Sequence, residues 1–183
     1  MKPLDRVLQH WRIAKVQSRI PQGARVLDVG CADGALFRQC KGRIGEGVGI
    51  DPALDTPVQM EQCKLLTGRF PQDLPAVQPF DVITMLAVLE HIPVEEQPGL
   101  ALACARLLNP GGSLLITIPS PLVDHILSLL KWMRLIDGMA DEQHYGFDPH
   151  QTPSLFAVEP LLLVKAEKFQ FGLNNLYLFQ KSS

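Results

Sequence analysis

The sequence predicts an α/β fold in which a mostly parallel sheet carries helices on both faces. Two observations predict it: short β-branched and apolar runs alternate with segments of helical spacing, and several of these runs end at a glycine or an acid. The length of 183 residues suits one domain, and no linker divides the chain. We therefore expect a single domain over residues 1–183.

The expected elements follow in chain order. A helix is expected over residues 1–20, because apolar residues recur there at the three-and-four spacing of one helix face. That face consists of Leu4, Val7, Leu8, Trp11 and Ala14. The other expected elements are helices at 35–41, 95–108 and 153–158, and strands at 25–29, 47–50, 63–67, 80–85, 113–118, 161–164 and 175–179.

Connections between these elements carry their own signals. Prolines at 71, 75 and 79 exclude regular structure before the strand at 80–85, and Asn109 to Gly112 is a strong turn signal. The connection around Phe171 to Leu173 is too short for a crossover helix. The last two strands should therefore form an antiparallel hairpin at one edge of the sheet.

Composition excludes several classes of protein. With 46% hydrophobic and 20% charged residues, the chain is neither disordered nor a disulfide scaffold. A net charge of −2 disfavours a nucleic-acid partner, and no apolar run is long enough to span a membrane or to serve as a secretory signal. We expect a cytoplasmic protein. The four cysteines form no C-x-x-C pair, so they are interpreted as small buried residues.

The stretch from Asp28 to Gly34 carries the chemistry. A strand enters a tight turn of small residues, and a helix starts behind it, so a ligand can approach the backbone closely. The frame Gly30, Ala32, Ala35 does not fit the G-x-G-x-x-G loop of dinucleotide sites. A carboxylate at Asp28 would repel a pyrophosphate and attract a cation or an ammonium group.

Further signals end or open the following strands. Asp51 comes 17 residues after Gly34, about the interval at which such folds place an acid on ribose hydroxyls. Phe80 and Asp81 open the next long strand, and Leu89, Glu90 and His91 follow its end. Each signal alone is weak, but their order at the ends of successive strands is specific.

These residues resemble the class I S-adenosylmethionine-dependent methyltransferases, most closely the small-molecule branch. The resemblance covers residues 20–120 and, in outline, the closing hairpin. It implies a Rossmann-like, doubly wound sheet of seven strands in the order 3-2-1-4-5-7-6, with the last strand antiparallel. It also implies S-adenosyl-L-methionine as cofactor, with the glycine loop around its methionine part and Asp51 on its ribose. The cofactor-binding residues so implied are Asp28, Gly30, Cys31, Ala32, Gly34, Asp51, Pro52, Phe70, Met85, Leu86 and Ala87.

Two positions depart from the family pattern. Ala32 stands where the loop usually has its middle glycine, which adds a methyl group beside the ligand. Arg69 stands where the family usually places an acid on the adenine amino group. Asp73 could take over that contact from the loop; otherwise packing and backbone groups near Phe70 hold the adenine.

His91 is the candidate general base, since it follows a strand at the carboxyl edge and an imidazole titrates near neutral pH. The alternative is that it only caps the next helix or packs against Glu90. His144 and Tyr145 are candidate contacts to the methyl acceptor. We predict no metal site.

Residues 120–146 are expected to form a helical insertion after the fifth strand, with an almost wholly apolar helix at 122–136. Three interpretations stay open for that helix: packing in the core or in a dimer, a lid over an apolar acceptor, and contact with a membrane surface. The lid follows from the resemblance, because insertions at this point cover the substrate in that family. The protein could be a monomer or a homodimer.

Two functional hypotheses remain. The first is a methyltransferase that acts on a small, apolar metabolite, its methyl acceptor, by in-line transfer. The second is a non-catalytic cofactor-binding or regulatory domain of the same fold, which Ala32 and Arg69 motivate. A nicotinamide dehydrogenase ranks below both, because the loop frame is wrong and 183 residues leave no room for a substrate domain.

Overall fold

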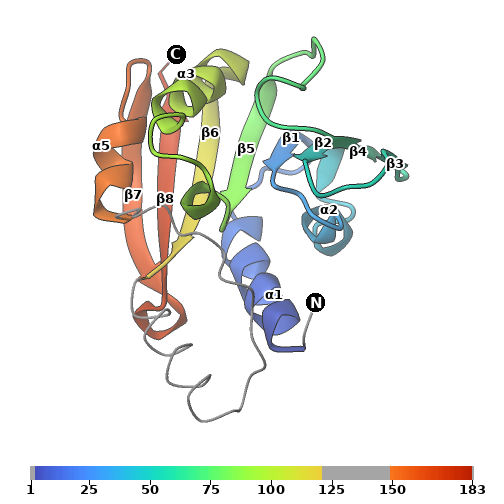
Figure 1. The fold of residues 1–183 in the computed structure, drawn as a ribbon, viewed down its shortest axis with the longest axis horizontal. Helices are drawn as coiled ribbons and strands as arrows, with labels where there is room; N and C mark the ends of the chain where they lie inside the picture. Colours follow the sequence, from blue (N-terminus) through green and yellow to red (C-terminus); the bar gives the residue numbers. More distant parts are fainter. Residues whose placement is uncertain (1–2, 121–148, 183) are drawn as a thin grey trace.

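The described residues form one sheet with a layer of helices on each of its two faces (Figure 1). The computed structural model describes residues 3–120 and 149–182. The strands are β1 (Ala24–Val29), β2 (Ile44–Asp51), β3 (Val58–Gln59), β4 (Cys63–Thr67), β5 (Phe80–Leu86), β6 (Leu108–Pro119), β7 (Leu161–Phe169) and β8 (Asn174–Lys181). The helices are α1 (Pro3–Gln17), α2 (Ala35–Gln39), α3 (Gln97–Leu107) and α5 (Thr152–Phe156), and short 3-10 turns occur at η1 (Leu89–His91), η2 (Pro149–Gln151) and η3 (Gln170–Gly172).

The predicted fold class is confirmed. The sheet order is β3-β4-β2-β1-β5-β6-β8-β7, which arranges the seven expected strands as predicted and adds β3 at one edge. Strands β4, β2, β1, β5 and β6 run parallel, whereas β8 is antiparallel to both β6 and β7. The expected count of seven strands was one short, because β3 has only two residues and therefore shows no alternating pattern in the sequence.

Each face of the sheet has its own core. On one face, α1 and α2 pack over the sheet, and Val26 of β1 belongs to that core. On the other face α3 and α5 cover the sheet, and the neighbouring Leu27 belongs there. Because successive strand residues point to opposite faces, Asp28 shares the α1 and α2 face with Val26.

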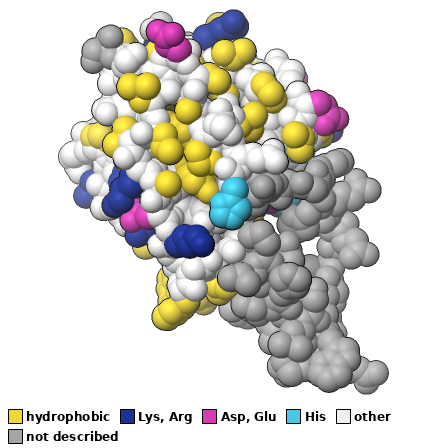
Figure 2. Space-filling model, turned by 90° about the vertical axis from the view of Figure 1, so that its left-hand side faces the viewer, with side chains coloured by type: hydrophobic (Ala, Val, Ile, Leu, Met, Phe, Trp, Pro, Cys, Tyr) yellow, Lys and Arg dark blue, Asp and Glu magenta, His cyan; other side chains and the backbone are white. Residues whose placement is uncertain are grey.

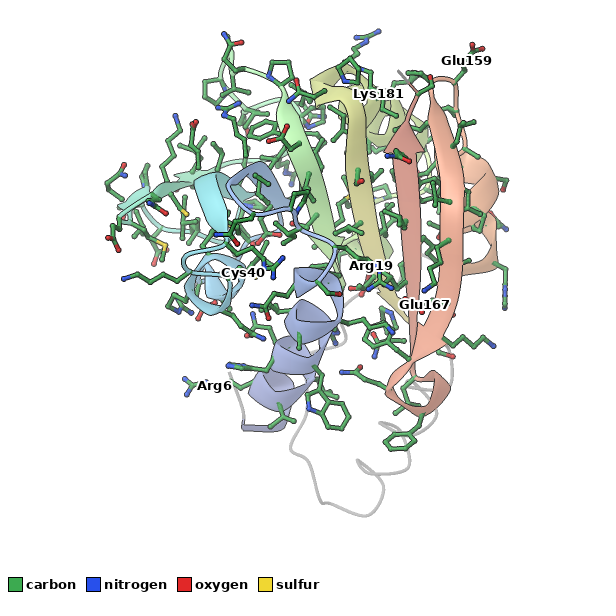
Figure 3. The ribbon with its side chains drawn as sticks, turned by 180° about the vertical axis from the view of Figure 1, so that it is seen from behind. Arg6, Arg19, Cys40, Glu159, Glu167 and Lys181 are labelled. Atoms are coloured by element: carbon green, nitrogen blue, oxygen red, sulfur yellow. The ribbon has the colours of Figure 1, made fainter. Side chains whose placement is uncertain are left out.

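The buried face of α1 is not the predicted one. Val7, Trp11 and Ala14 are exposed, whereas Ile13 and Val16 are buried. Two apolar stripes occur on this helix, and the buried one continues through the last turn towards β1. Just after α1, Arg19 points at Glu167 of β7 and pairs with it, as Figure 3 shows. These contacts fix the helix beside the carboxyl edge of the sheet.

The expected turn at Asn109 to Gly112 lies inside β6. Phe80 pairs with Leu108 and Val82 with Ser113, so four residues of β6 lie opposite the single residue Asp81 of β5. The Asp81 carboxylate secures this bulge: Oδ1 accepts a hydrogen bond from Asn109 Nδ2 and Oδ2 accepts one from the Arg25 backbone N–H, each at 2.8 Å. One side chain thus joins β1, β5 and the start of β6.

The outer strand β7 exposes apolar side chains to solvent, and Figure 2 shows hydrophobic side chains spread over this side of the molecule. Leu162 and Val164 are 61% and 56% exposed. The pairing of β7 with β8 is irregular between Leu163 and Lys165, which is the signature of a bulge. This edge is therefore apolar but not regular.

The expected insertion at 120–146 lies outside the described residues, apart from Ser120. The interpretations of the 122–136 helix, including the lid and the membrane contact, consequently stay open. Within residues 3–120 and 149–182, no helix combines the length and the apolar character that crossing a membrane requires.

Asp81→Ala should lower the free energy of unfolding by about 2–4 kcal/mol, because two hydrogen bonds to one carboxylate are lost. Asp81→Asn should lose about half of that, since its amide can still accept from Arg25 N–H but cannot accept from Asn109. Urea denaturation followed by circular dichroism measures both. An unchanged midpoint in Asp81→Ala would contradict the joining role of this side chain.

Candidate functional site

The loop after β1 curls into a compact turn at the centre of the carboxyl edge. Gly30 has φ +72° and Gly34 has φ +77°, both in the left-handed region that glycine adopts without strain. The Gly30 N–H donates to the Ile50 carbonyl at 2.9 Å, which holds the loop against the end of β2. A Cβ on Gly30 would lie 2.3 Å from a methyl of Val88, so no side chain fits there.

Ala32 takes the conformation expected of the glycine it replaces. Its φ is +44°, a value that costs an alanine steric energy. Its backbone N–H donates to Asp51 Oδ2 at 2.8 Å, so the strained residue is held by the acid at the end of β2. The Ala32 backbone is therefore tied to the end of β2.

Asp28 is buried inside this region. It is 4% exposed, and its Oδ1 accepts a hydrogen bond from Thr84 Oγ1 of β5 at 2.6 Å. Burial raises the pKa of Asp28 to about 7; the Thr84 hydrogen bond opposes that rise, and the nearby Asp51 charge adds to it. The carboxyl group therefore changes charge near neutral pH.

Asp51 closes the same region from β2. It is 9% exposed, and its Oδ1 accepts a hydrogen bond from the Ala53 N–H at 2.8 Å while Oδ2 is bound to Ala32. Each of these oxygens keeps a second lone pair free for another donor. Asp51 is thus oriented by the backbone on both sides of it.

The two acids give a chemical test of the expected cofactor. Neither Asp28 nor Asp51 has a lysine or arginine partner in the part of the chain that the structure describes. Buried carboxylates without a cation are costly and favour a positively charged ligand over a phosphate. A nucleoside that carries an ammonium and a sulfonium group fits these two acids, whereas the Asp28 carboxylate would repel a pyrophosphate.

The end of β5 meets the loop from the other side. Ala87 has φ +59° and donates its N–H to the Thr117 carbonyl at 2.9 Å, which turns the chain so that Val88 lies on Gly30. His91 follows in η1 and is exposed, whereas Glu90 beside it is 4% exposed. The structure thus leaves His91 accessible at the same edge as the two acids.

The loop after β4 closes on itself. Asp73 Oδ2 accepts a hydrogen bond from the Arg69 backbone N–H at 2.8 Å, and a Cβ on Gly68 would lie 2.5 Å from the Asp73 side chain. The exposed Asp73 carboxylate therefore lies directly beside the end of β4, while Phe70 is 8% exposed in the core.

Most expected cofactor residues meet at this edge. The loop from Gly30 to Gly34, Asp28, Asp51 and the end of β5 come together, with Pro52 exposed and Leu86 and Ala87 half-buried. Met85 is fully buried in the core of the α3 face, so its side chain does not reach the surface. His144 and Tyr145 lie outside the described residues.

The cysteines are buried, as expected. Cys31, Cys40, Cys63 and Cys104 are all free. Burial raises the pKa of each thiol, so none of them is a nucleophile at neutral pH. Cys31 contributes packing to the loop: a Cβ on Gly49 would lie 2.6 Å from its Sγ.

Two contributors were missed from the sequence. Thr84 contacts Asp28, and Val88 fills the space above Gly30. A threonine between the apolar residues Ile83 and Met85 is the signal that could have identified the first. Val88 has no signal, because its role depends on the turn at Ala87.

Comparison with known proteins identifies the family. The sequence model of a family described as "Methyltransferase domain" matches residues 4–158. The chain belongs to this family of methyltransferases, and the resemblance to class I S-adenosylmethionine-dependent enzymes is confirmed. S-adenosylmethionine, the expected cofactor, is the one this family uses.

Curated relatives include ubiquinone biosynthesis O-methyltransferases. The one from Xanthomonas euvesicatoria pv. vesicatoria is 37% identical over 127 residues, which cover 63% of this chain and 52% of the relative. The one from Xanthomonas oryzae pv. oryzae is 35% identical over 130 residues with the same coverage. The chain thus matches about half the length of these relatives.

Solved structures share the fold. The N-methyltransferase NodS from Bradyrhizobium japonicum, in its complex with S-adenosyl-L-homocysteine, has a TM-score of 0.69 at 16% identity and covers 100% of this chain and 89% of its own. Magnesium protoporphyrin IX methyltransferase from Synechocystis has a TM-score of 0.67 at 18% identity, covering 97% and 85%. At these identities the likeness concerns the fold.

Asp28→Asn should stabilise the cofactor-free protein at alkaline pH. The folded-state pKa lies above the unfolded value, so the folded protein holds a proton that the unfolded chain releases between about pH 4 and pH 7. Stability from this group is complete below that window and falls as the pH rises through it, by on the order of 4 kcal/mol.

Thermal melting at pH 5 and pH 8 measures this effect. The stability gained by Asp28→Asn should be larger at pH 8 than at pH 5, whereas Asp33→Asn, at an exposed acid of the same loop, should show little difference. A gain that is equal at both pH values would mean that Asp28 does not titrate in this window.

Proposed function

We propose that the protein is an S-adenosylmethionine-dependent methyltransferase whose acceptor is a small, apolar molecule. The observation that carries the proposal is the pair of buried acids, Asp28 and Asp51, which border a tight loop without a cationic partner among the described residues. The family assignment supports the reaction class, and the relatives named for ubiquinone biosynthesis favour a hydroxyl group on an apolar acceptor.

The chain's own residues divide the binding task. Asp51 would accept hydrogen bonds from the ribose hydroxyls, and Asp28 would face the ammonium of the methionine part. The loop from Gly30 to Gly34 would enclose that part, with backbone alone at Gly30, where Val88 excludes a side chain. Asp73, beside the end of β4, would take the adenine contact that Arg69 cannot make.

When bound, S-adenosylmethionine supplies a methyl group activated by its sulfonium. The protein then has to hold acceptor and donor in line, and alignment of this kind contributes about 7–11 kcal/mol to lowering a barrier. A hydroxyl acceptor also has to lose its proton. His91, exposed in η1 directly after β5, is our proposed base for that proton.

A non-catalytic cofactor-binding domain is the second candidate. Ala32 in a left-handed conformation favours it, because the methyl group narrows the loop where the ligand would pass. The two candidates share the cofactor site and differ in turnover. Methyl transfer therefore separates them.

Asp51→Ala should weaken S-adenosyl-L-homocysteine binding by about tenfold to over a hundredfold, because hydrogen bonds to a charged group worth about 1.5–3 kcal/mol are lost. Isothermal titration calorimetry measures the affinity. The matched control is Asp33→Ala, which removes an exposed acid paired with Arg38 in the same loop and should bind normally. Equal affinity in Asp51→Ala and the wild type would refute the ribose assignment.

His91→Asn should lower the rate of methyl transfer by about 10²–10⁴-fold while S-adenosyl-L-homocysteine still binds. The assay is mass spectrometry of a panel of apolar hydroxylated acceptors incubated with the cofactor. His10→Asn, at an exposed histidine of α1, should leave the rate unchanged. If the wild type binds the cofactor but methylates no acceptor, the binding-domain candidate is favoured.

A further inference from the structure

The two central strands place one hydroxyl against one acid. Asp28 of β1 and Thr84 of β5 are register partners in a parallel pair, 4% and 0% exposed. Thr84 Oγ1 lies 2.6 Å from Asp28 Oδ1 and 3.3 Å from the Leu27 carbonyl oxygen. Both strands are interior to the sheet, so neither side chain can withdraw from the other.

This geometry gives the hydroxyl two settings. A hydroxyl carries one hydrogen, which it can donate to an ionised Asp28 across the short distance. When Asp28 is protonated, its own O–H donates to Thr84, and the Thr84 hydrogen can turn to the Leu27 carbonyl. The 2.6 Å contact between Thr84 and Asp28 is made in both settings, but only an ionised Asp28 accepts the Thr84 hydrogen across it.

The surroundings of Asp28 oppose its charge. Burial raises the pKa of Asp28, and the Asp51 carboxylate on β2 raises it further. The remaining titratable neighbours are thiols: Cys31 in the loop and Cys40 at the end of α2, both affected by the charge of Asp28. α1 carries the half-buried Arg12 next to the buried Ile13, and β5 contributes Thr84. Among the described groups that shift the pKa of Asp28, the Thr84 hydroxyl is the one that favours the ionised form.

We infer that Thr84 is a positioning residue that keeps the Asp28 carboxylate charged and oriented for the ammonium group of the cofactor. The inference rests on the proposed function, since it assigns Asp28 to that ammonium. Thr84 touches neither cofactor nor acceptor in this role. It acts through Asp28, and its removal should therefore change how binding depends on pH.

The test compares Thr84→Val with the wild type by titrating S-adenosyl-L-homocysteine from pH 6 to pH 9. A lost hydrogen bond to a charged group should raise the pKa of Asp28 by about one to two units. Binding that requires the ionised form should then weaken by about five- to fiftyfold at pH 7 and by about twofold or less at pH 9. Because both proteins meet the same ligand, its own ionisation cancels in the ratio.

Two further variants keep the result interpretable. Thr84→Ser retains the hydroxyl and should bind like the wild type at every pH, whereas Thr84→Ala should repeat the behaviour of Thr84→Val. In cofactor-free protein, the pH window in which stability falls should extend upward by the same one to two units in Thr84→Val. This readout needs no ligand.

The outcomes separate the two levels of the proposal. If the wild type binds no S-adenosyl-L-homocysteine at any pH, the proposed function fails and this inference with it. If the wild type binds, but the ratio between Thr84→Val and wild type is the same at pH 7 and pH 9, the role of Thr84 is only structural. Loss of folding in both Thr84→Val and Thr84→Ala, with normal Thr84→Ser, likewise assigns the hydroxyl to stability and overturns the inference.

Discussion

The burial of two carboxylates at the end of the central strands is the constraint on which the site depends. Asp28 and Asp51 lie beside one loop, and their hydrogen-bond donors are neutral groups. One hydroxyl donates to Asp28, and two backbone N–H groups donate to Asp51. A protein that only needed stability would do better with apolar residues at Asp28. A cationic ligand at this acid would offset that cost in stability.

The glycines and left-handed residues around this loop serve the same arrangement. Gly30 lets Val88 approach, and the turn at Ala87 brings Val88 there. The ends of β1 and β5 are thereby packed directly on each other. Atoms that would bind a ligand are held by the sheet and by steric contact, which reduces the reorganisation that binding requires.

Much of the fold could be predicted because each strand carries a short, self-contained signal. The run from Arg25 to Val29 and the alternation with helical segments sufficed for the parallel α/β class, and the short connection at 170–172 sufficed for the hairpin. The strand order came from the resemblance to the methyltransferase family, not from the pattern itself. β3 could not be predicted, because two residues have no periodicity. The buried face of α1 was predicted wrongly, because Trp11 and Ile13 belong to competing stripes and only the packing of the helix decides between them.

Some residues of the site could likewise be predicted from the sequence, and others could not. Asp28 and Asp51 could be predicted because acids near the ends of parallel strands lie at the ligand-binding edge of such a sheet, whatever the exact loop geometry. Thr84 and Val88 act through neighbours on other strands, and register and turn geometry become visible only in three dimensions. The candidate base His91 has an accessible position, and its role stays a prediction.

The two rims of the sheet differ from its centre in one respect. At one edge, β3 is only two residues long, so it has few backbone groups with which another chain could pair. At the other edge, the pairing of β7 is irregular between Leu163 and Lys165, and the strand carries a second lysine, Lys168. An edge strand with a bulge and lysines pairs poorly with a strand of another molecule, even where leucine and valine side chains are exposed. The exposed apolar side chains of β7 are thus compatible with a protein that does not aggregate by edge-to-edge strand pairing.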